Sequence, residues 1–554
     1  RFDLPYLINR MKRLGIKYDR LSPMDTVFLG KELGDVVIKG VSTIDLYDVY
    51  RKFSEGLEES YKLDFIGRKI AGIGKTECCS NVRWLWRHNL DDLISYNTQD
   101  VRIVVETDSK LKLLDFMDEL RRLSFCQLED CLSASRTLDS YILRYYHDRK
   151  VFPTKKKHEK VHYEGAFVGS WGSGVFENVV VFDLRSLYPS IIQSLNLSPE
   201  TIEEEGGEII DIALSGNTFL VPQASSSDNI ITINNLKIKQ DIKGFLPQVI
   251  EELFRERTKY KNLMKNEEFD SDQYKVYDNR QRALKTLLNA LYGQTAYTGS
   301  RIFDARIAET TTWMGRIIIH WSKDFLENVG YRVIYADTDS LSFVMEDGID
   351  IDQIHYVLDL LNQSYDDFAK QYGLTRHIFQ MEWEKVYRRA FFGSSKKRYS
   401  GHLIYKDGKP VDKLDTMGFE IRRSDASQFS RNLQSQVFDM LLRQDKSKDE
   451  VLRYIGDQID RIRKGNYKFT EIGIPKGINK DLSDYGSKIL SDGKVKHRSS
   501  VPANIRGARY TTGVLGYDLS NKPKMIYLSS MPNGYQETDV LCFDEDNQVP
   551  PGTH

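Results

Sequence analysis

The stretch YRVIYADTDSLSFVM, residues 331–345, sets two aspartates between two short runs of mainly apolar residues. Such runs on either side of a polar turn are typical of a buried β-hairpin. Because side chains alternate along a strand, we expect Asp337 and Asp339 to point the same way, at most about 7 Å apart. Two ionised carboxylates that close repel each other, which favours a proton or a divalent cation between them. A solvent-exposed hairpin turn explains the residues about as well, since Asp, Thr and Ser are ordinary turn residues.

Chain length and charge bound the interpretation. A chain of 554 residues is too long for one hydrophobic core, so we expect roughly three to five domains. The 79 Lys and Arg nearly balance the 80 Asp and Glu, so net charge neither indicates nor excludes a nucleic-acid partner. Residues 461–510, however, hold 12 Lys and Arg against 4 Asp and Glu. Such a basic region fits phosphate binding, although a run of charge is more often a solvated face.

The cysteines and the apolar runs indicate an intracellular protein. The cysteines are Cys78, Cys79, Cys126, Cys131 and Cys542. They contain no CxxC pair and no zinc-finger spacing, so neither a disulfide framework nor a structural zinc is expected. No apolar run approaches the roughly 20 residues that span a bilayer, which predicts a soluble protein without a membrane partner. The opening RFDLPYLINRMKRLGI lacks Met and already lies inside an amphipathic pattern, so we expect a missing N-terminal part.

A third carboxylate ends another apolar strand. In ENVVVFDLRSLYPSII, residues 177–192, the β-branched run predicts a strand that ends at Asp183, followed by a turn that Pro189 helps to close. Alone, an aspartate at this place is better explained as a helix cap. Together with Asp337 and Asp339, it makes the acidic cluster that two Mg²⁺ ions about 3.5–4 Å apart need for in-line phosphoryl transfer.

Residues 245–264 and 279–297 are rich in good helix formers and predict two helices. In the first, Arg257 and Lys261 are one turn apart and therefore lie on one face. A solvated cationic stripe is the simplest explanation of such a pair.

The second of these helices adds an aromatic residue to its stripe. Lys285, Asn289 and Tyr292 follow each other at i, i+4 and i+7 on one face, and Gly293 leaves room for a base or a sugar to approach. Cations that neutralise a triphosphate, beside a ring that stacks on a base, are what a nucleotide site requires. We therefore favour a nucleotide site over a solvated stripe.

Several of these stretches together resemble a known family. DLRSLYPSII, KTLLNALYG and YADTDS occur in the order and with the internal spacing of the three polymerase motifs of family-B DNA polymerases. YEGA, residues 163–166, resembles the sequence between the exonuclease and polymerase parts, and KKRY, residues 396–399, the sequence before the thumb. The resemblance extends over nearly the whole chain. It is closest to replicative enzymes of T-even-like bacteriophages and archaea.

The resemblance implies a two-metal polymerase site. It assigns catalysis to Asp183, Asp337 and Asp339. It assigns two Mg²⁺ ions, with Mn²⁺ as a substitute, to Asp183, Asp339 and the carbonyl of Leu184.

The resemblance also implies substrate contacts. The residues assigned to the incoming nucleotide are Arg257, Lys261, Lys285, Asn289, Tyr292, Tyr188 and Leu184. Among these, Tyr188 would be the steric gate that rejects a 2′-hydroxyl. The residues assigned to DNA are Lys396, Lys397, Tyr399 and Arg506.

The proofreading exonuclease of the family is expected to be incomplete in this chain. Phe2 and Asp3 resemble the end of its second motif, and YNTQD supplies Tyr96 and Asp100 of its third. The first motif is absent, so Asp3 and Asp100 are the only two candidates for four metal-binding carboxylates.

The fold that the resemblance implies is a multidomain α+β and α/β right-hand polymerase. The expected boundaries are 1–125 for a partial ribonuclease-H-like exonuclease domain, 126–240 for the first part of the palm, 241–297 for the fingers, 298–424 for the second part of the palm and 425–554 for the thumb.

The implied function is template-directed DNA synthesis on primer-template DNA with dNTPs, by a monomer in the cytoplasm of a prokaryotic or virus-infected cell. A sliding clamp is a further candidate partner. A catalytically silent, nucleic-acid-binding subunit is one alternative, which the intact Asp183, Asp337, Asp339 and Lys285 disfavour. An enzyme that acts mainly as a nuclease is another, which the half-empty exonuclease site disfavours.

Overall fold

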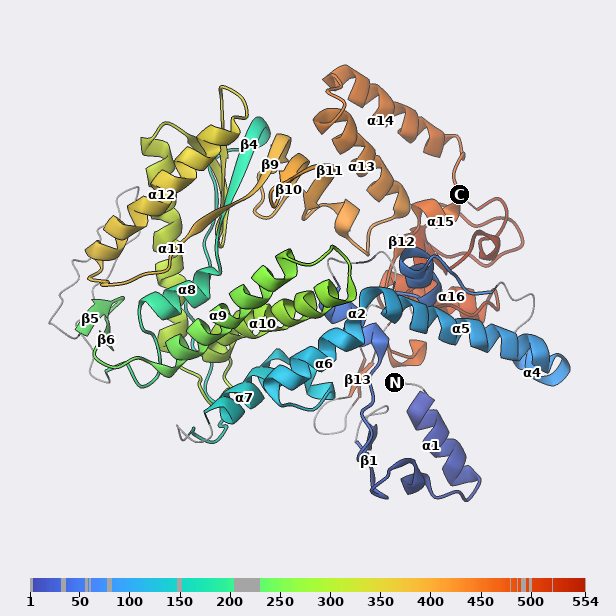
Figure 1. Cartoon of the computed structure of the whole chain (residues 1–554). Helices are drawn as coiled ribbons and strands as arrows, with labels where there is room; N and C mark the ends of the chain where they lie inside the picture. The colour runs from blue at the N-terminus through green and yellow to red at the C-terminus, as the bar shows by residue number, and fades with distance from the viewer. Residues whose placement is uncertain are drawn as a thin grey trace.

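The computed structural model describes most of the chain, and Figure 1 shows how its elements are arranged. The described residues are 3–30, 36–54, 58, 61–76, 82–146, 152–203, 230–478, 480–485, 487–489, 495–497, 501–520 and 522–553. Cys78 and Cys79 lie outside them, as does part of the basic region 461–510.

The N-terminal region, residues 3–146, is mainly helical. Its helices are α1 (Asp3–Arg13), α2 (Leu46–Phe53), α3 (Leu63–Ile66), α4 (Val82–His88), α5 (Leu90–Leu111), α6 (Leu113–Ser124) and α7 (Ala134–Tyr145). Its one sheet, among the residues that are described there, is the antiparallel pair β1 (Val27–Leu29) and β2 (Val36–Ile38). A larger sheet of the ribonuclease-H-like kind is not present in this described part.

A seven-stranded antiparallel sheet forms the centre of the fold, in the order β11-β10-β9-β4-β8-β7-β3. Its strands are β3 (Val168–Ser170), β4 (Gly174–Leu184), β7 (Arg332–Asp337), β8 (Ser340–Val344), β9 (Met381–Phe392), β10 (Tyr399–Lys406) and β11 (Lys409–Met417). Alternate residues of β4 enter two different cores: Val180 and Phe182 join the main core, and Val179 and Val181 join a smaller one on the other face. Helices α11 (Ala305–Asn328) and α12 (Ile351–Gln371) cover the main-core face (Figure 1).

A helical hairpin is inserted in the chain between β4 and β7. Its elements are α9 (Phe245–Lys265) and α10 (Asp272–Ala296), and they follow the short helix α8 (Leu187–Ser194) and the small pair β5 (Ile230–Ile233) and β6 (Leu236–Lys239). Helix α10 also packs on the N-terminal helices: Arg280 Nη1 lies 2.8 Å from Glu119 Oε2, and the Arg282 guanidinium lies 5.1 Å from the ring centre of Phe116. The hairpin and the helices α6 and α7 therefore share the main core.

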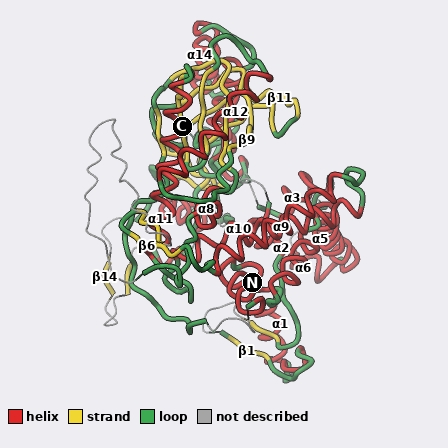
Figure 2. Tube along the Cα trace, turned by 60° about the vertical axis from the view of Figure 1, so that its left-hand side comes forward, coloured by secondary structure: helices red, strands yellow, loops and turns green. Residues whose placement is uncertain are grey.

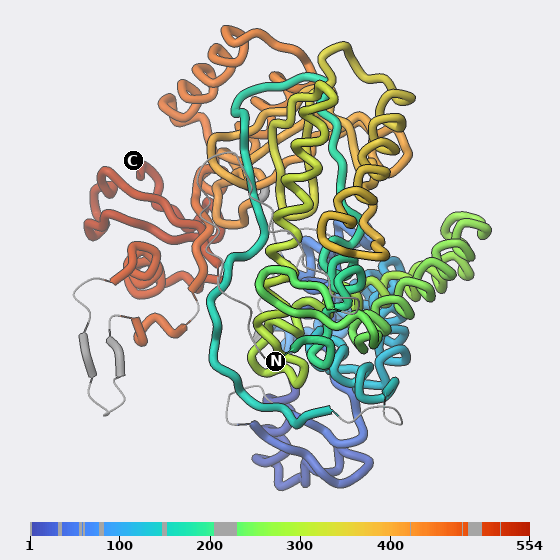
Figure 3. The backbone as a smooth tube through the Cα atoms, turned by 90° about the vertical axis from the view of Figure 1, so that its left-hand side faces the viewer, coloured from blue at the N-terminus to red at the C-terminus, as the bar shows by residue number. Residues whose placement is uncertain are grey.

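An extended segment, residues 152–167, joins the N-terminal helices to β3 and runs along the molecule without helix or strand (Figure 3). The His158 amide donates to the Thr298 carbonyl at 2.9 Å. Arg316 of α11 donates to the carbonyls of Glu164 and Gly165, at 2.8 Å each. The YEGA sequence is thus fastened to the helix that supports the sheet.

The C-terminal region forms cores of its own. Its elements are α13 (Gln428–Leu442), α14 (Lys448–Arg463), α15 (Phe469–Ile472), β12 (Ile474–Pro475), β13 (Ser487–Ile489), β14 (Val495–His497), α16 (Ala503–Gly513), β15 (Lys524–Tyr527) and β16 (Val540–Phe543). Two small clusters around Phe543 and Cys542 are separate from the main core. Figure 2 shows the strands of the main sheet gathered at one end of the molecule, away from the helices of the N-terminal region.

The described cysteines are free thiols. The sulfur atoms of Cys126 and Cys131 lie 3.7 Å apart as a hydrogen-bonded pair, and Cys542 is buried. These three residues form no disulfide with one another in the described part of the chain. Within the described ranges, no helix is both long and apolar enough to span a membrane.

Candidate active site

The two aspartates of YADTDS flank a very tight turn. Strand β7 ends at Asp337 and β8 begins at Ser340, which is its register partner, so Thr338 and Asp339 form the turn. Thr338 has a φ of +61°, and the Asp339 amide donates to the Asp337 carbonyl at 2.7 Å. A β-branched residue is strained in this conformation, as in a γ-turn. Two bonds from outside the hairpin hold it: the Thr338 amide donates to Phe167 at 2.9 Å, and the Leu184 amide donates to the Asp339 carbonyl at 2.7 Å.

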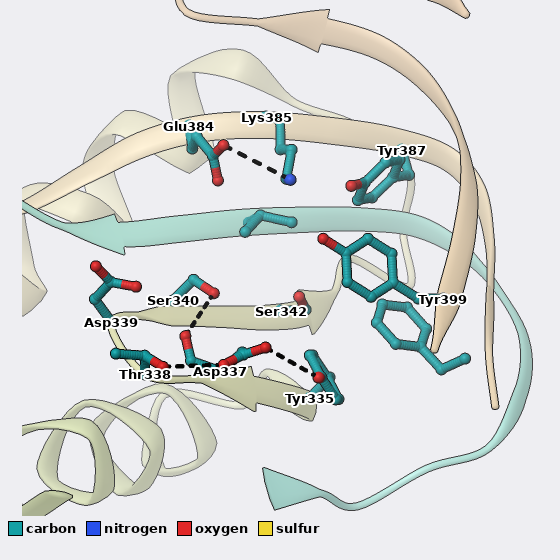
Figure 4. Close-up of a pocket in the computed structure, with 12 residues that line it drawn as sticks. Tyr335, Asp337, Thr338, Asp339, Ser340, Ser342, Glu384, Lys385, Tyr387 and Tyr399 are labelled. Carbon is teal, nitrogen blue, oxygen red and sulfur yellow. Dashed lines mark hydrogen bonds and ion pairs between the residues drawn. The ribbon is translucent and has the colours of Figure 1, made fainter. Parts of the chain in front are cut away.

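The expectation that Asp337 and Asp339 share one face of a strand is therefore wrong, because side chains alternate only within a strand and the turn lies between these residues. The Asp337 carboxylate accepts from Thr338 Oγ1 at 3.0 Å and from Tyr335 Oη at 3.4 Å, and lies 3.2 Å from Lys397 Nζ. Figure 4 shows Asp339 on the other side of the turn. Asp337 thus has a cation of its own.

Asp183 lies beside Asp339 because of strand register. Its backbone partners are Ser340 of β8 on one side and Glu382 of β9 on the other. The strand continues one residue past Asp183, to Leu184. The residue therefore belongs to a central strand, and the alternative that it caps a helix does not hold.

Pro189 does not close a turn, as we expected, but is the third residue of helix α8. In the first turn of a helix an amide has no partner within the helix, and the fixed φ of proline suits helical geometry. The chain turns earlier, at Ser186, which has a φ of +49°.

The electrostatics of Asp183 and Asp339 indicate negative charge that nearby lysines compensate only in part. Burial raises the pKa of Asp183 to about 8, repulsion by Asp339 and Glu384 adds to the effect, and Lys385 acts against it. Burial also raises the pKa of Asp339 to about 6, against the effect of a backbone hydrogen bond and with repulsion by Asp337 and Glu384. These two half-buried carboxylates therefore bind protons unusually well when no other cation is near.

Glu384 is a functional candidate that our sequence reasoning missed. It lies on β9, lines the same pocket as Asp339, and raises the pKa of both Asp183 and Asp339. The signal was the sequence MEWEKVY, in which Glu382 and Glu384 stand in a β-branched and aromatic strand shortly before KKRY. Carboxylates in such a strand are unusual unless they serve a site.

The acid pair fits a divalent cation with few protein ligands. No group of three or more His, Cys, Asp or Glu is arranged as a metal cage in the part of the chain that the structure describes. Mg²⁺ is commonly held by one or two carboxylates, with waters and substrate phosphates completing its shell. Asp183 and Asp339 match the carboxylates of this ligand set, with Leu184 the next residue of β4 after Asp183, and their raised pKa values indicate charges that are compensated only in part.

A pocket of about 220 Å³ opens beside the acid pair (Figure 4). It is lined by Val181, Tyr335, Asp337, Thr338, Asp339, Ser340, Ser342, Glu384, Lys385, Tyr387, Phe392 and Tyr399. These residues come from five neighbouring strands of the central sheet and from the β7–β8 turn.

The cations predicted on α9 lie near the acidic strands. Burial lowers the pKa of Arg257 and of Lys261, and in both cases Glu382 of β9 acts in the opposite direction. Arg257 Nε is buried and has no hydrogen-bond partner. A half-buried guanidinium with an unpaired donor near Glu382 is suited to bind an anionic ligand.

On α10 the predicted stripe is only partly exposed. Lys285 and Asn289 are exposed, whereas Tyr292 is half-buried. The ring of Tyr292 packs on Tyr188 of α8, with 4.4 Å between ring centres, and its hydroxyl lies 3.4 Å from that of Tyr163 in the extended segment. The structure therefore brings Tyr188 and Tyr292 into contact, which the sequence analysis did not predict.

The residues assigned to DNA are found in two different places. Lys397 contacts Asp337, exposed Lys396 precedes it, and Tyr399 lines the pocket. Arg506 instead belongs to α16 in the C-terminal region, where it pairs with Asp539 and donates to the Val501 carbonyl. The structure therefore places three of these four residues at the acidic site and its margin.

The exonuclease candidates are engaged with a lysine. Tyr96 and Asp100 lie one turn apart on α5, and Lys75 Nζ lies 2.7 Å from Asp100 Oδ2 and 3.2 Å from the Tyr96 hydroxyl. Asp3 begins α1. The charge of Asp100 is thus balanced within the protein.

Comparison with known proteins agrees with this geometry. The family model described as DNA polymerase family B matches residues 131–504, more than half of the chain. The chain is 29% identical to a DNA polymerase of Thermococcus gorgonarius over 87% of this chain and 60% of the relative. It is 29% identical to a DNA polymerase of Archaeoglobus fulgidus over 88% of this chain and 57% of the relative. It is also 29% identical to DNA polymerase 2 of Aeropyrum pernix, over 99% of this chain and 64% of the relative.

The chain thus spans about 60% of the length of the relatives it matches. The matched residues 131–504 include the acid pair, the α9–α10 hairpin and the whole central sheet. The chain belongs to DNA polymerase family B.

Proposed function

We propose that this chain catalyses template-directed DNA synthesis: it transfers dNMP from a dNTP to the 3′-hydroxyl of a primer and releases pyrophosphate. The observation that carries the proposal is the Asp183–Asp339 pair, only partly compensated at the centre of the sheet, with cations of α9 near Glu382 of the adjacent strand. Membership of a family whose relatives are named DNA polymerases supports it.

Asp183, Asp339 and the Leu184 carbonyl would hold two Mg²⁺ ions, with Mn²⁺ as a substitute. Bound Mg²⁺ supplies charge stabilisation at the phosphoryl group and favours ionisation of the attacking hydroxyl. The protein's own contribution is to keep the two carboxylates together on adjacent strands. Asp337, which Lys397 holds, supports the turn and adds negative potential.

The incoming dNTP would lie between the acid pair and the helical hairpin. In this proposal Arg257, Lys261 and Lys285 bind the triphosphate, and exposed Asn289 lines the same face. Tyr292 packs against the nascent base pair. Tyr188, held by its contact with Tyr292, lies under the sugar and excludes a 2′-hydroxyl.

We also propose that this chain does not proofread. Two-metal hydrolysis requires carboxylates that are free to bind metal, whereas Asp100 makes an ion pair with Lys75.

Primer extension on a defined template, with each dNTP omitted in turn, tests the proposed function. We expect Mg²⁺-dependent extension that stops where the omitted dNTP is required. A protein that binds primer-template DNA tightly, yet adds no nucleotide with Mg²⁺ or Mn²⁺, would instead be the catalytically silent subunit.

A further inference from the structure

The pocket beside the acid pair contains a cation that the proposed function does not yet use. Among its lining residues, Asp337, Asp339 and Glu384 are carboxylates, and Lys385 is the only cation. The side chain of Lys385 is 13% exposed, and Figure 4 shows it reaching from β9 into the region of the pocket. The Lys385 side chain therefore lines the pocket and is largely shielded from bulk solvent.

The Lys385 ammonium is held in one position by neighbouring strands. Its Nζ lies 3.3 Å from Asp415 Oδ2 and 3.6 Å from Glu384 Oε1. The Tyr387 hydroxyl donates to the same Asp415 oxygen at 2.6 Å. A lysine that is already ordered loses little conformational entropy when it binds a ligand.

Aromatic rings complete the surroundings of this ammonium. Its Nζ lies 5.6 Å from the ring centre of Tyr387 and 5.8 Å from that of Tyr399. Burial by itself lowers the pKa of Lys385, but the nearby Tyr399, Glu384 and Asp415 raise it overall, so the group stays charged.

The position of the pocket indicates what it receives. In the proposed reaction the 3′-hydroxyl of the primer must reach Asp183 and Asp339, while the triphosphate has cations on α9 and α10. The pocket, at about 220 Å³, suits a sugar and its phosphate, and its walls include the apolar faces of Tyr335 and Phe392. A primer strand that enters beside three carboxylates needs a fixed positive charge to offset the repulsion of its phosphates.

We propose that Lys385 binds a phosphate of the primer strand next to its 3′ end, and that Asp415 and Tyr387 act as positioning residues for its ammonium. The inference rests on the proposed function, because it takes the primer terminus to lie at the acid pair. The same chemistry could serve the triphosphate of the dNTP, so the experiment separates the two sources of phosphate.

The test compares wild type with Lys385→Met and Lys385→Arg. Lys409→Met is the matched control, since Lys409 is an exposed lysine at the start of β11 and outside the pocket. Primer-template affinity is measured without dNTP at several salt concentrations, and dNTP affinity is measured by single-nucleotide incorporation. We expect Lys385→Met to weaken primer-template binding roughly 5- to 10-fold. The slope of log affinity against log salt concentration should become shallower by about one. The dNTP affinity should not change, Lys385→Arg should recover most of the loss, and Lys409→Met should resemble wild type.

A second measurement locates the phosphate. A set of primers carries one neutral methylphosphonate at each of the last four linkages in turn. Wild type should lose affinity at one linkage, and Lys385→Met should be insensitive at that same linkage. Asp415→Asn, which leaves the lysine in place but less well held, should show a smaller loss with the same position dependence.

Two outcomes would overturn the inference. One is a Lys385→Met protein that folds and binds primer-template DNA as wild type does. The other is a loss confined to dNTP affinity, which would assign Lys385 to the triphosphate. The proposed function can fail while the inference holds: wild type would then add no nucleotide but would still show the loss of affinity at one methylphosphonate linkage.

Discussion

From the sequence, one carboxylate site of this chain was expected to bind metal and the other to be an incomplete remnant of a metal site. The two sites differ in how their charges are compensated. At the centre of the sheet, Asp183 and Asp339 lie together and repel each other. On α5, Asp100 makes an ion pair with Lys75, 2.7 Å away. Half-buried charge that is not fully compensated destabilises a fold and is typical of functional sites. A charge that is paired within the protein is explained as well by a structural role. At the first site, therefore, the charges of Asp183 and Asp339 are compensated only in part, whereas at the second the charge of Asp100 is balanced by Lys75.

The sharpest way to break this comparison is to remove one acid from each site. Asp339→Asn should lower the rate of nucleotide addition roughly 10³-fold or more, because the metals and the transition-state charge lose a ligand. Single-turnover extension at saturating dNTP measures it. Asp100→Asn is the control and should extend primers at the wild-type rate. Near-normal addition by Asp339→Asn would contradict the two-metal assignment.

The cations that we propose bind the triphosphate give the next largest effect. Lys285→Ala should reduce kcat/KM for the dNTP roughly 10- to 100-fold, through weaker nucleotide binding and slower incorporation together. Pre-steady-state incorporation over a range of dNTP concentrations separates the two, and primer-template affinity should stay within about twofold of wild type. A loss confined to DNA affinity would move Lys285 from the nucleotide to the duplex.

The ion pair on α5 predicts that this chain does not shorten a mismatched primer from its 3′ end. A 3′-labelled mismatched primer, incubated with Mg²⁺ and no dNTP, should keep its length while the same preparation extends a paired primer. Asp100→Ala should behave as wild type does. Rapid Mg²⁺-dependent shortening that Asp100→Ala abolishes would show that the ion pair with Lys75 opens and that further ligands complete the site.

The smallest predicted effect concerns stability without metal. The pKa of Asp183 is raised to about 8 and that of Asp339 to about 6, from an ordinary value of 3.8. As pH rises from 4 to 8 the unfolded chain releases these protons first, so the folded protein loses stability across this window and regains it as pH falls. In EDTA, the Tm of Asp183→Asn should therefore exceed that of wild type by a margin that grows between pH 5 and pH 8.

Asp100→Asn supplies the contrast for this measurement. It breaks the ion pair with partly buried Lys75, so its Tm should lie below that of wild type at every pH in the same series. A constant margin for Asp183→Asn, or an increase in Tm for Asp100→Asn, would contradict the difference between the two sites.

Local pattern sufficed for much of the fold. The β-branched run before Asp183 predicted β4, the turn in YADTDS predicted the β7–β8 hairpin, and helix formers predicted α9 and α10. The spacing of Lys285, Asn289 and Tyr292 predicted one helical face, because a helix repeats every 3.6 residues wherever it lies. These features depend on neighbours in the chain, which the sequence displays directly.

Tertiary structure decided which charges are compensated. Nothing in YADTDS indicates that Lys397, 60 residues away, holds Asp337, or that Lys75 holds Asp100. The alternation of side chains that we expected from Asp337 to Asp339 does not hold, because a turn at Thr338 lies between them. Hydrogen bonds with Phe167 and Leu184, which are distant in sequence, hold that turn.

Residue types and their order along the chain were enough by themselves to indicate membership of DNA polymerase family B and to mark Asp183, Asp337 and Asp339 as candidates, because the motifs are contiguous in sequence. Only the sheet register placed Glu384 and Lys385 beside the acid pair, and only packing made Asp415 the anchor of the lysine. The physical reason is that a charge acts through space over a few ångströms, and pairs at that range can be far apart along the chain.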